Sequence, residues 1–101
     1  MKDITVEELK SRLSRAESLN LIDVRETWEY DEFNIGAQNL PLSGFMSFMP
    51  QLEELKDEEV IVHCKMGGRS MQAAALLEQM GFKNVKNVVG GIDEWKTKFP
   101  K

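Results

Sequence analysis

The chain has 101 residues, of which 42% are apolar and 30% charged, and it contains one cysteine and one histidine. This length predicts a single globular domain over residues 1–101, and a lone cysteine excludes an internal disulfide and a cysteine-rich metal site. The formal net charge of −4, with no long run of either sign, argues against a nucleic-acid-binding face.

The chain also shows no sign of a membrane segment. No stretch approaches the roughly 18–20 continuous apolar residues that span a bilayer. Residues 1–4 lack the apolar region of a secretory signal peptide. We therefore expect a soluble cytoplasmic protein without a membrane partner, either a monomer or a weak dimer.

The first elements are predicted from capping and apolar spacing. Thr5 and Glu8 have the spacing of a capping box, and apolar residues then recur at helical intervals. This pattern predicts a helix over residues 6–15, preceded by a very short strand around Ile4. Residues 19–24 are short, apolar and rich in branched side chains, which indicates a buried strand.

The middle of the chain predicts shorter elements. Thr27 is expected to cap a short helical turn over residues 27–30, and an extended piece is expected at residues 39–40. Apolar residues spaced by three and four predict a helix over residues 43–55. Pro50 lies inside that segment, so we expect a kink or two short pieces.

The second half of the chain carries the clearest elements. Residues 60–62 predict the most buried strand, and residues 70–80 a strong helix that Gly81 ends. A last strand at residues 85–89 and a terminal helix at residues 92–99 follow. Strands alternating with helices predict the α/β class: a mostly parallel central sheet of about five strands, helices on both faces and thus three layers. In such sheets, ligands bind beyond the carboxyl ends of the strands.

Several side chains are given a structural interpretation. Trp28 and Trp95 are expected in the core, and the acidic residues 57–59 in a solvated turn. Residues that fill the core are expected along two helices; they are Phe45, Met46, Phe48 and Met49 in the first and Ala73, Ala74, Leu76, Leu77 and Met80 in the second. The alternative for the first set is the wall of a substrate mouth.

The segment after the most buried strand has the composition of an anion-binding loop. Gly67 and Gly68 allow backbone conformations that turn several N–H groups toward one point, and the following helix adds its own free N–H groups. Lys65 and Arg69 add positive charge, and Arg69 has the geometry to hold an oxyanion with two hydrogen bonds. The expected result is an anion cradle with the thiol of Cys64 at its floor.

The same cradle should lower the pKa of the Cys64 thiol and so make it a reactive nucleophile. The alternative interpretation of a lone cysteine after an apolar strand is an inert, small apolar residue. His63 is expected on the opposite side of the strand from Cys64, because side chains alternate along a strand. We expect it to point into the sheet or to pair with backbone groups; a Cys–His pair is the alternative.

Four segments of the chain resemble the signatures of the rhodanese-like domain family, in the family's order and spacing. The resemblance covers nearly the whole chain. The third segment is the loop from Cys64 to Ser70. The four segments are Leu21-Ile22-Asp23-Val24-Arg25 with Glu29-Tyr30, then Ile35-Gly36-Ala37 through Leu40-Pro41-Leu42, then Cys64 to Ser70, then Gly81-Phe82 through Val85, Val88, Gly90-Gly91-Ile92 and Trp95.

The resemblance implies a sulfurtransferase of the thiosulfate sulfurtransferase type, with Cys64 as its catalytic residue. Cys64 would take a sulfane sulfur from thiosulfate or a persulfide donor and become a persulfide. It would then pass the sulfur to a nucleophilic acceptor, either a low-molecular-weight thiol or a thioredoxin-like protein. No cofactor and no metal are implied. The implied residues for the small anionic donor are Lys65, Met66, Gly67, Gly68, Arg69 and Ser70.

The resemblance also assigns Asp23 and Arg25 a structural role, and it leaves two alternatives. One is a non-catalytic interaction module, which should have lost the cysteine or the order of the loop. The other is a cysteine-dependent phosphatase or arsenate reductase, whose loop is one residue longer than the segment from Cys64 to Arg69. The segment 34–37 is one residue shorter than in many family members and lacks their His and Pro.

Overall fold

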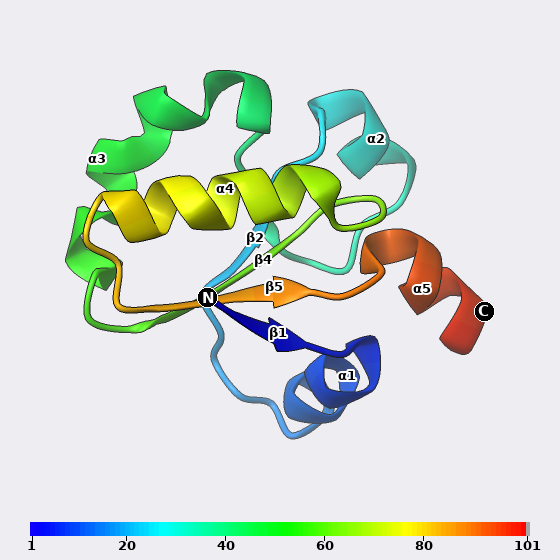
Figure 1. The fold of residues 1–101 in the computed structure, drawn as a ribbon. Helices are drawn as coiled ribbons and strands as arrows, with labels where there is room; N and C mark the ends of the chain where they lie inside the picture. The colour runs from blue at the N-terminus through cyan, green and yellow to red at the C-terminus, as the bar shows by residue number, and fades with distance from the viewer. Residues whose placement is uncertain (101) are drawn as a thin grey trace.

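The computed structural model describes residues 1–100, which form one sheet of five parallel strands in the order β1-β5-β4-β2-β3 (Figure 1). The strands are β1 Lys2–Ile4, β2 Leu21–Asp23, β3 Gln38–Asn39, β4 Glu59–His63 and β5 Asn84–Val88. The helices are α1 Val6–Ser14, α2 Thr27–Glu32, α3 Met49–Leu52, α4 Gly68–Gln79 and α5 Gly91–Lys98, with 3-10 turns η1 Leu42–Phe48 and η2 Glu53–Leu55. The predicted α/β class and parallel sheet are confirmed. No helix within residues 1–100 has the length and apolar character needed to cross a membrane.

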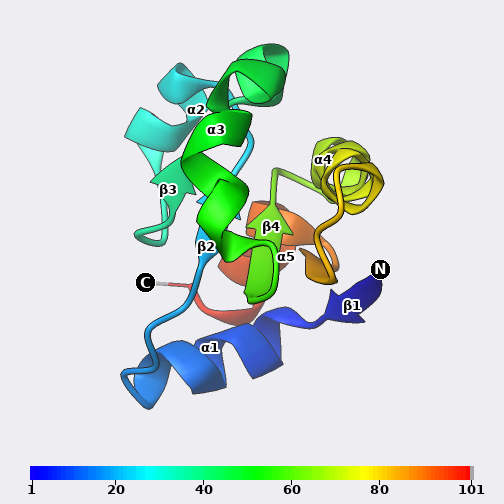
Figure 2. The same cartoon turned by 90° about the vertical axis from the view of Figure 1, so that its left-hand side faces the viewer.

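Helices cover both faces of the sheet, so the domain has three layers (Figures 1 and 2). The alternation along β4 shows how: Val60 and Val62 enter an apolar cluster with α3 and α4, whereas Ile61 enters a second cluster with α1. Trp95 and Phe99 of the C-terminal segment pack against this second cluster. Cys64 continues the alternation and lies on the α4 face.

Two predictions need correction: the residue that caps α2 and the way the segment over residues 43–55 is broken. The residue that caps α2 is Glu26, not Thr27: the Glu29 side chain accepts a hydrogen bond from the Glu26 amide, which closes a capping box. The segment over 43–55 consists of η1, α3 and η2, and Pro50 lies in the first turn of α3, where a proline is tolerated. Gly44, with φ −121° and ψ 22°, provides an additional break inside η1.

Several core predictions are wrong, and for the methionines the reason is that helical spacing does not show how far a core extends. Trp28 is 64% exposed, and the Met46 and Met80 side chains also face solvent. Trp95, by contrast, is partly buried and meets the Phe99 ring edge to face at 5.1 Å. Glu59 is not in a solvated turn, because its carboxylate accepts hydrogen bonds from Arg12 at 2.6 and 2.9 Å and from Lys86 at 2.6 Å.

The short turn between α2 and β3 is closed by local hydrogen bonds. The Asn34 side chain donates to the Tyr30 carbonyl and accepts from the Gly36 amide, each at 3.0 Å. Gly36 has φ +87°, a conformation that side chains other than glycine seldom adopt. Tyr30 then donates its hydroxyl to the Ala37 carbonyl at 2.5 Å, which ties the turn to α2.

His63 is buried on the opposite face of β4 from Cys64, as predicted, and so does not form a Cys–His pair. Neither ring nitrogen has a hydrogen-bond partner, and Nε2 lies 3.9 Å from the Asp23 carboxylate. Burial lowers the pKa of His63 from 6.5 to about 4; the Asp23 carboxylate opposes this shift, and Arg25 adds to it. The predicted pairing with backbone is therefore not observed among residues 1–100.

The depressed pKa of His63 gives the stability a pH dependence of known sign. Between pH 6.5 and 4 the unfolded chain binds a proton that the folded protein excludes. The free energy of unfolding should therefore fall as pH falls, by up to about 1.4 kcal/mol per pH unit. Urea titrations at pH 7.5 and 5.5 should show a loss of about 1 kcal/mol, and His63→Leu should remove most of it. The same loss in His63→Leu would assign the effect to other groups.

Candidate active site

The candidate nucleophile lies in the connection between β4 and α4, at the carboxyl edge of the sheet. Cys64 directly follows β4, and α4 begins at Gly68 after a loop of three residues. Gly67 caps α4 with φ +121°, so glycine is required there, whereas Gly68 has an ordinary φ. Of the two loop glycines, only Gly67 has the backbone conformation that the sequence analysis expected of both.

Backbone amides of the loop point at the sulfur of Cys64. Gly67 N–H donates to Sγ at 3.0 Å and Ser70 N–H donates at 3.3 Å, while the Ser70 hydroxyl lies 3.4 Å from Sγ. Cys64 is 1% exposed, so these groups replace water around the sulfur. The arrangement is the predicted cradle, with the thiol at its floor and the N-terminus of α4 beneath it.

The pKa of the Cys64 thiol is lowered, as predicted, but the cause differs from the expected one. Burial alone would raise this pKa; hydrogen bonds from the Ser70 hydroxyl and from the amides of Ser70, Gly67 and Met66 outweigh it. The sequence predicts full positive charges from Lys65 and Arg69 instead.

Both cations are instead paired with carboxylates. Arg69 holds Glu29 through both terminal nitrogens at 2.6 and 2.9 Å, and Lys65 Nζ lies 2.9 Å from Asp93. The Arg69 side chain is the main reason that the pKa of Glu29 falls to about 2, so this pair persists across the physiological range. That Arg69 and Lys65 bind a donor anion stays a prediction.

Glu29 and Asp93 were missed as members of this region. They lie 40 and 28 positions from their partners, and only the fold brings them to the loop. Glu29 belongs to the first family signature, but the sequence offers no sign that its carboxylate reaches Arg69. The capping box of α2 holds the Glu29 carboxylate in place, since it also accepts from the Glu26 amide.

The start of α5 holds the other side of the loop. Ile92 N–H donates to the Cys64 carbonyl and Asp93 N–H donates to the Lys65 carbonyl, both at 2.9 Å. Gly91 precedes these donors with φ +56° and lies directly against the same carbonyls. The backbone of the loop is thus bound between the N-termini of α4 and α5, which places its amides around one point.

A buried ion pair supports α2 and, through it, Glu29. The carboxylate of Asp23 accepts from Arg25 Nε at 3.1 Å and from Nη2 at 2.8 Å, and both side chains are almost fully buried. Arg25 also donates to the carbonyls of Phe33 at 2.6 Å and Glu29 at 3.4 Å. The pair touches neither Cys64 nor its ring of amides in any of these contacts, which agrees with the structural role expected for it.

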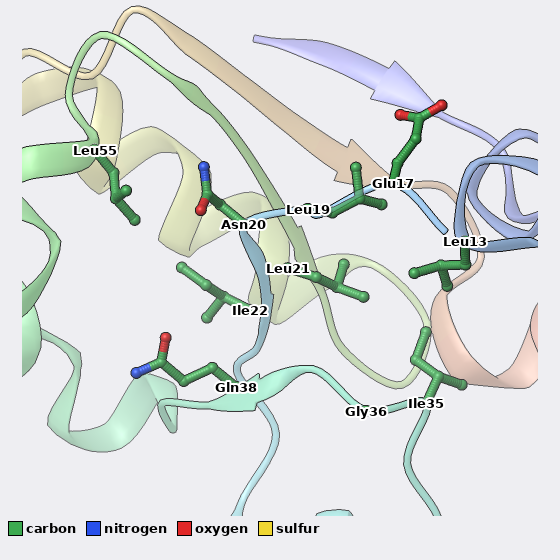
Figure 3. Close-up of a pocket in the computed structure, with 10 residues that line it drawn as sticks. All are labelled: Leu13, Glu17, Leu19, Asn20, Leu21, Ile22, Ile35, Gly36, Gln38 and Leu55. Atoms are coloured by element: carbon green, nitrogen blue, oxygen red, sulfur yellow. The ribbon is translucent and has the colours of Figure 1, made fainter. Parts of the chain in front are cut away.

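Two pockets flank the loop, and a larger one lies elsewhere. A pocket of about 230 Å³ lies beside the exposed Trp28 and Lys65, and another of about 290 Å³ lies beside the exposed Met66 and the buried Asn87. A pocket of about 380 Å³ opens at the start of β2, where Figure 3 shows Leu21. That end of the sheet is opposite Cys64, because β2 and β4 are parallel. Within residues 1–100 no group of three His, Cys, Asp or Glu side chains is placed to hold a metal ion.

Comparison with known families agrees with this geometry. A family model described as a rhodanese-like domain matches residues 5–98. The chain belongs to the rhodanese-like domain family. The match runs from the cap of α1 to the end of α5 and includes four of the five strands, β2 to β5, so the fold expected from the four family-like segments is confirmed.

Relatives of this rhodanese-like protein include both single-domain and longer proteins. YrkF of Bacillus subtilis (strain 168), by name a candidate sulfur carrier protein, is 37% identical over 97 residues; these are 95% of this chain but 51% of YrkF, so the chain spans about half of that relative. A protein named sulfurtransferase from Allochromatium vinosum is 35% identical over 96 residues, which cover 94% of this chain and 88% of that protein. The crystal structure of SSP1007 from Staphylococcus saprophyticus subsp. saprophyticus is 38% identical, with a TM-score of 0.84 over 94% of this chain and 93% of that one.

Proposed function

We propose that this protein is a sulfurtransferase that carries a sulfane sulfur on Cys64. The observation that supports the proposal best is the environment of Sγ, which receives the amides of Gly67 and Ser70 at 3.0 and 3.3 Å at the N-terminus of α4. Such an environment stabilises an anionic sulfur, both as the attacking thiolate and as a bound persulfide. Relatives named sulfurtransferase and sulfur carrier protein agree with this chemistry.

The proposed reaction is a double displacement. The Cys64 thiolate attacks the outer, sulfane sulfur of the donor, and the donor's S–S bond breaks with its electron pair. The leaving group is sulfite when the donor is thiosulfate, and the donor's thiolate when the donor is a persulfide. An acceptor thiolate next attacks the outer sulfur of the Cys64 persulfide, and the thiolate of Cys64 is regenerated as that S–S bond breaks.

The proposed donor is thiosulfate or a small persulfide, and the acceptor is an external thiol. The loop amides offer hydrogen bonds to the anionic end of either donor, and the guanidinium of Arg69 lies at the edge of the cradle, where it is partly exposed. Because the chain has one cysteine, the second thiol must come from another molecule: a low-molecular-weight thiol or a thioredoxin-like protein. A reducing compartment such as the cytoplasm suits an unpaired reactive thiol.

Mass spectrometry after incubation with thiosulfate or glutathione persulfide tests the proposal. Wild-type protein should gain the mass of one sulfur atom, and Cys64→Ala should gain none. The adduct should disappear on addition of a thiol, with formation of the acceptor's persulfide. Because no other cysteine is present, the adduct maps to Cys64 without further digestion.

The same preparation separates the competing chemistry. Release of inorganic phosphate from a phosphate ester, together with no sulfur adduct from either donor, would replace sulfur transfer by phosphatase chemistry. If Cys64 were unreactive and neither a sulfur adduct nor phosphate release were observed, the remaining interpretation would be a non-catalytic interaction module. Folding of each sample is checked by circular dichroism, so that a negative result is not caused by loss of structure.

A further inference from the structure

Two buried polar side chains form a layer behind the sulfur of Cys64. Ser70 on α4 is 0% exposed and Asn87 on β5 is 3% exposed. The Ser70 hydroxyl lies 3.4 Å from Cys64 Sγ and 3.1 Å from the Gly67 carbonyl, and it donates to Oδ1 of Asn87. Within residues 1–100, Asn87 makes no other side-chain hydrogen bond.

The Ser70 hydroxyl has fewer protons than it has neighbouring acceptors. The Ser70 hydroxyl has one proton, but three neighbouring atoms can accept it: the sulfur, the Gly67 carbonyl and Oδ1 of Asn87. When the hydroxyl proton points at Asn87, the hydroxyl cannot donate a hydrogen bond to the sulfur. In that arrangement the hydroxyl accepts from the thiol of Cys64 and so favours the protonated sulfur.

Asn87 is the member of the layer whose hydrogen-bonding role can reverse. A backbone carbonyl only accepts, whereas a side-chain amide presents either its oxygen or its NH₂ group after a half-turn about its terminal bond. With the NH₂ group toward Ser70, Asn87 donates to the hydroxyl oxygen and the hydroxyl proton is directed to the sulfur. The pocket of about 290 Å³ beside Asn87 lies next to the amide that must turn.

We propose that Asn87 is a positioning residue that sets the direction of the Ser70 hydroxyl and so the stability of the Cys64 thiolate. In the thiol state, sulfur donates to Ser70 and Ser70 donates to Oδ1 of Asn87. In the thiolate state, Nδ2 of Asn87 donates to Ser70 and Ser70 donates to sulfur. The proton of the thiol leaves to solvent, and the turning amide exchanges none. The catalytic meaning of this relay rests on the proposed sulfur transfer.

The pH dependence of Cys64 alkylation by iodoacetamide tests the relay without any sulfur donor. Asn87→Asp presents only acceptor oxygens, which keep the Ser70 proton away from sulfur. Its alkylation profile should shift to higher pH, with a rate at pH 7 about tenfold below wild type. Val89→Asp is a charge control, because Val89 lines the same pocket on an exposed position and makes no hydrogen bond to Ser70.

A second pair of variants asks whether Asn87 acts through Ser70. Ser70→Ala should itself shift the alkylation profile to higher pH. Asn87→Leu should change the profile in wild type and should add nothing in a Ser70→Ala background, because the intermediary is gone. An Asn87→Asp shift no larger than that of Val89→Asp, or an Asn87→Leu shift that survives in Ser70→Ala, would overturn the proposal.

The wild-type protein supplies a readout that needs no variant to fold. The ¹⁵N and NH₂ resonances of the Asn87 side chain should titrate with the same midpoint as Cys64 alkylation. Resonances that stay constant through that midpoint would contradict the relay. None of these measurements uses a sulfur donor, so absence of a persulfide adduct would count against the proposed function and leave the relay standing.

Discussion

Gly91→Ala is expected to lower the free energy of unfolding by about 2–5 kcal/mol, because it combines backbone strain with a clash. Gly91 has φ +56°, and a Cβ added there would lie 2.4 Å from the Cys64 carbonyl oxygen and 2.7 Å from that of Lys65. Both contacts are with backbone, which cannot rotate away as a side chain can. The loop at Cys64 must therefore move, and its amides should lose their aim at the sulfur.

Gly68→Ala is the matched control, since it adds a methyl group at the end of the loop that Gly91 packs against. A Cβ at Gly68 meets nothing within 4 Å, and its φ is ordinary. We expect its stability to stay within about 0.5 kcal/mol of wild type. Urea unfolding and the rate of Cys64 alkylation at pH 7 measure both effects. If the two alanine variants behaved alike in both assays, the close packing of α5 against the loop would play no part in building the site.

The parts of the fold that the sequence predicted are those set by local patterns. The run at residues 60–62 and the helix near residues 70–80 were found because apolar residues follow the period of each element. The end of that helix is predicted because a glycine often follows the last turn of a helix, and the structure gives Gly81 the positive φ, +96°, that this position favours. The inward-pointing amides around Cys64 are predicted from the junction of this strand and helix, and the structure shows two of them, those of Gly67 and Ser70, donating to Sγ.

Contacts between distant segments could not be predicted in the same way. The carboxylates of Glu29 and Asp93 form ion pairs with Arg69 and Lys65, and nothing near either acid in sequence indicates this. Trp28 was placed in the core because large aromatic side chains are usually buried, but α2 contributes no buried residue at all. The lowered pKa of Cys64 was therefore predicted with the right sign from a partly wrong cause.

Asp23→Ala is expected to lower the free energy of unfolding by about 3–5 kcal/mol, because it leaves the buried guanidinium of Arg25 without its counter-ion. Arg25 is 4% exposed, so little of its guanidinium can be hydrated in place of the lost carboxylate. The effect should extend to the candidate active site. Arg25 donates to the carbonyls of Glu29 on α2 and of Phe33 directly after it, and the Glu29 side chain in turn holds Arg69.

A double-mutant cycle with Arg25→Leu distinguishes a buried charge from a lost contact. If the penalty in Asp23→Ala comes from an unpaired charge, removing Arg25 as well should cost less than the sum of the single variants, by about 1–3 kcal/mol.

Asp57→Ala provides the surface control, because Asp57 and Lys83 form a pair at 3.0 Å with both side chains more than 70% exposed. That variant should change stability by less than about 1 kcal/mol. Equal losses in Asp23→Ala and Asp57→Ala, measured by urea unfolding at pH 7, would mean that burial does not make the Asp23–Arg25 pair special. A large loss at Asp23 alone, relieved by Arg25→Leu, would show that the penalty comes from the unpaired buried charge of Arg25.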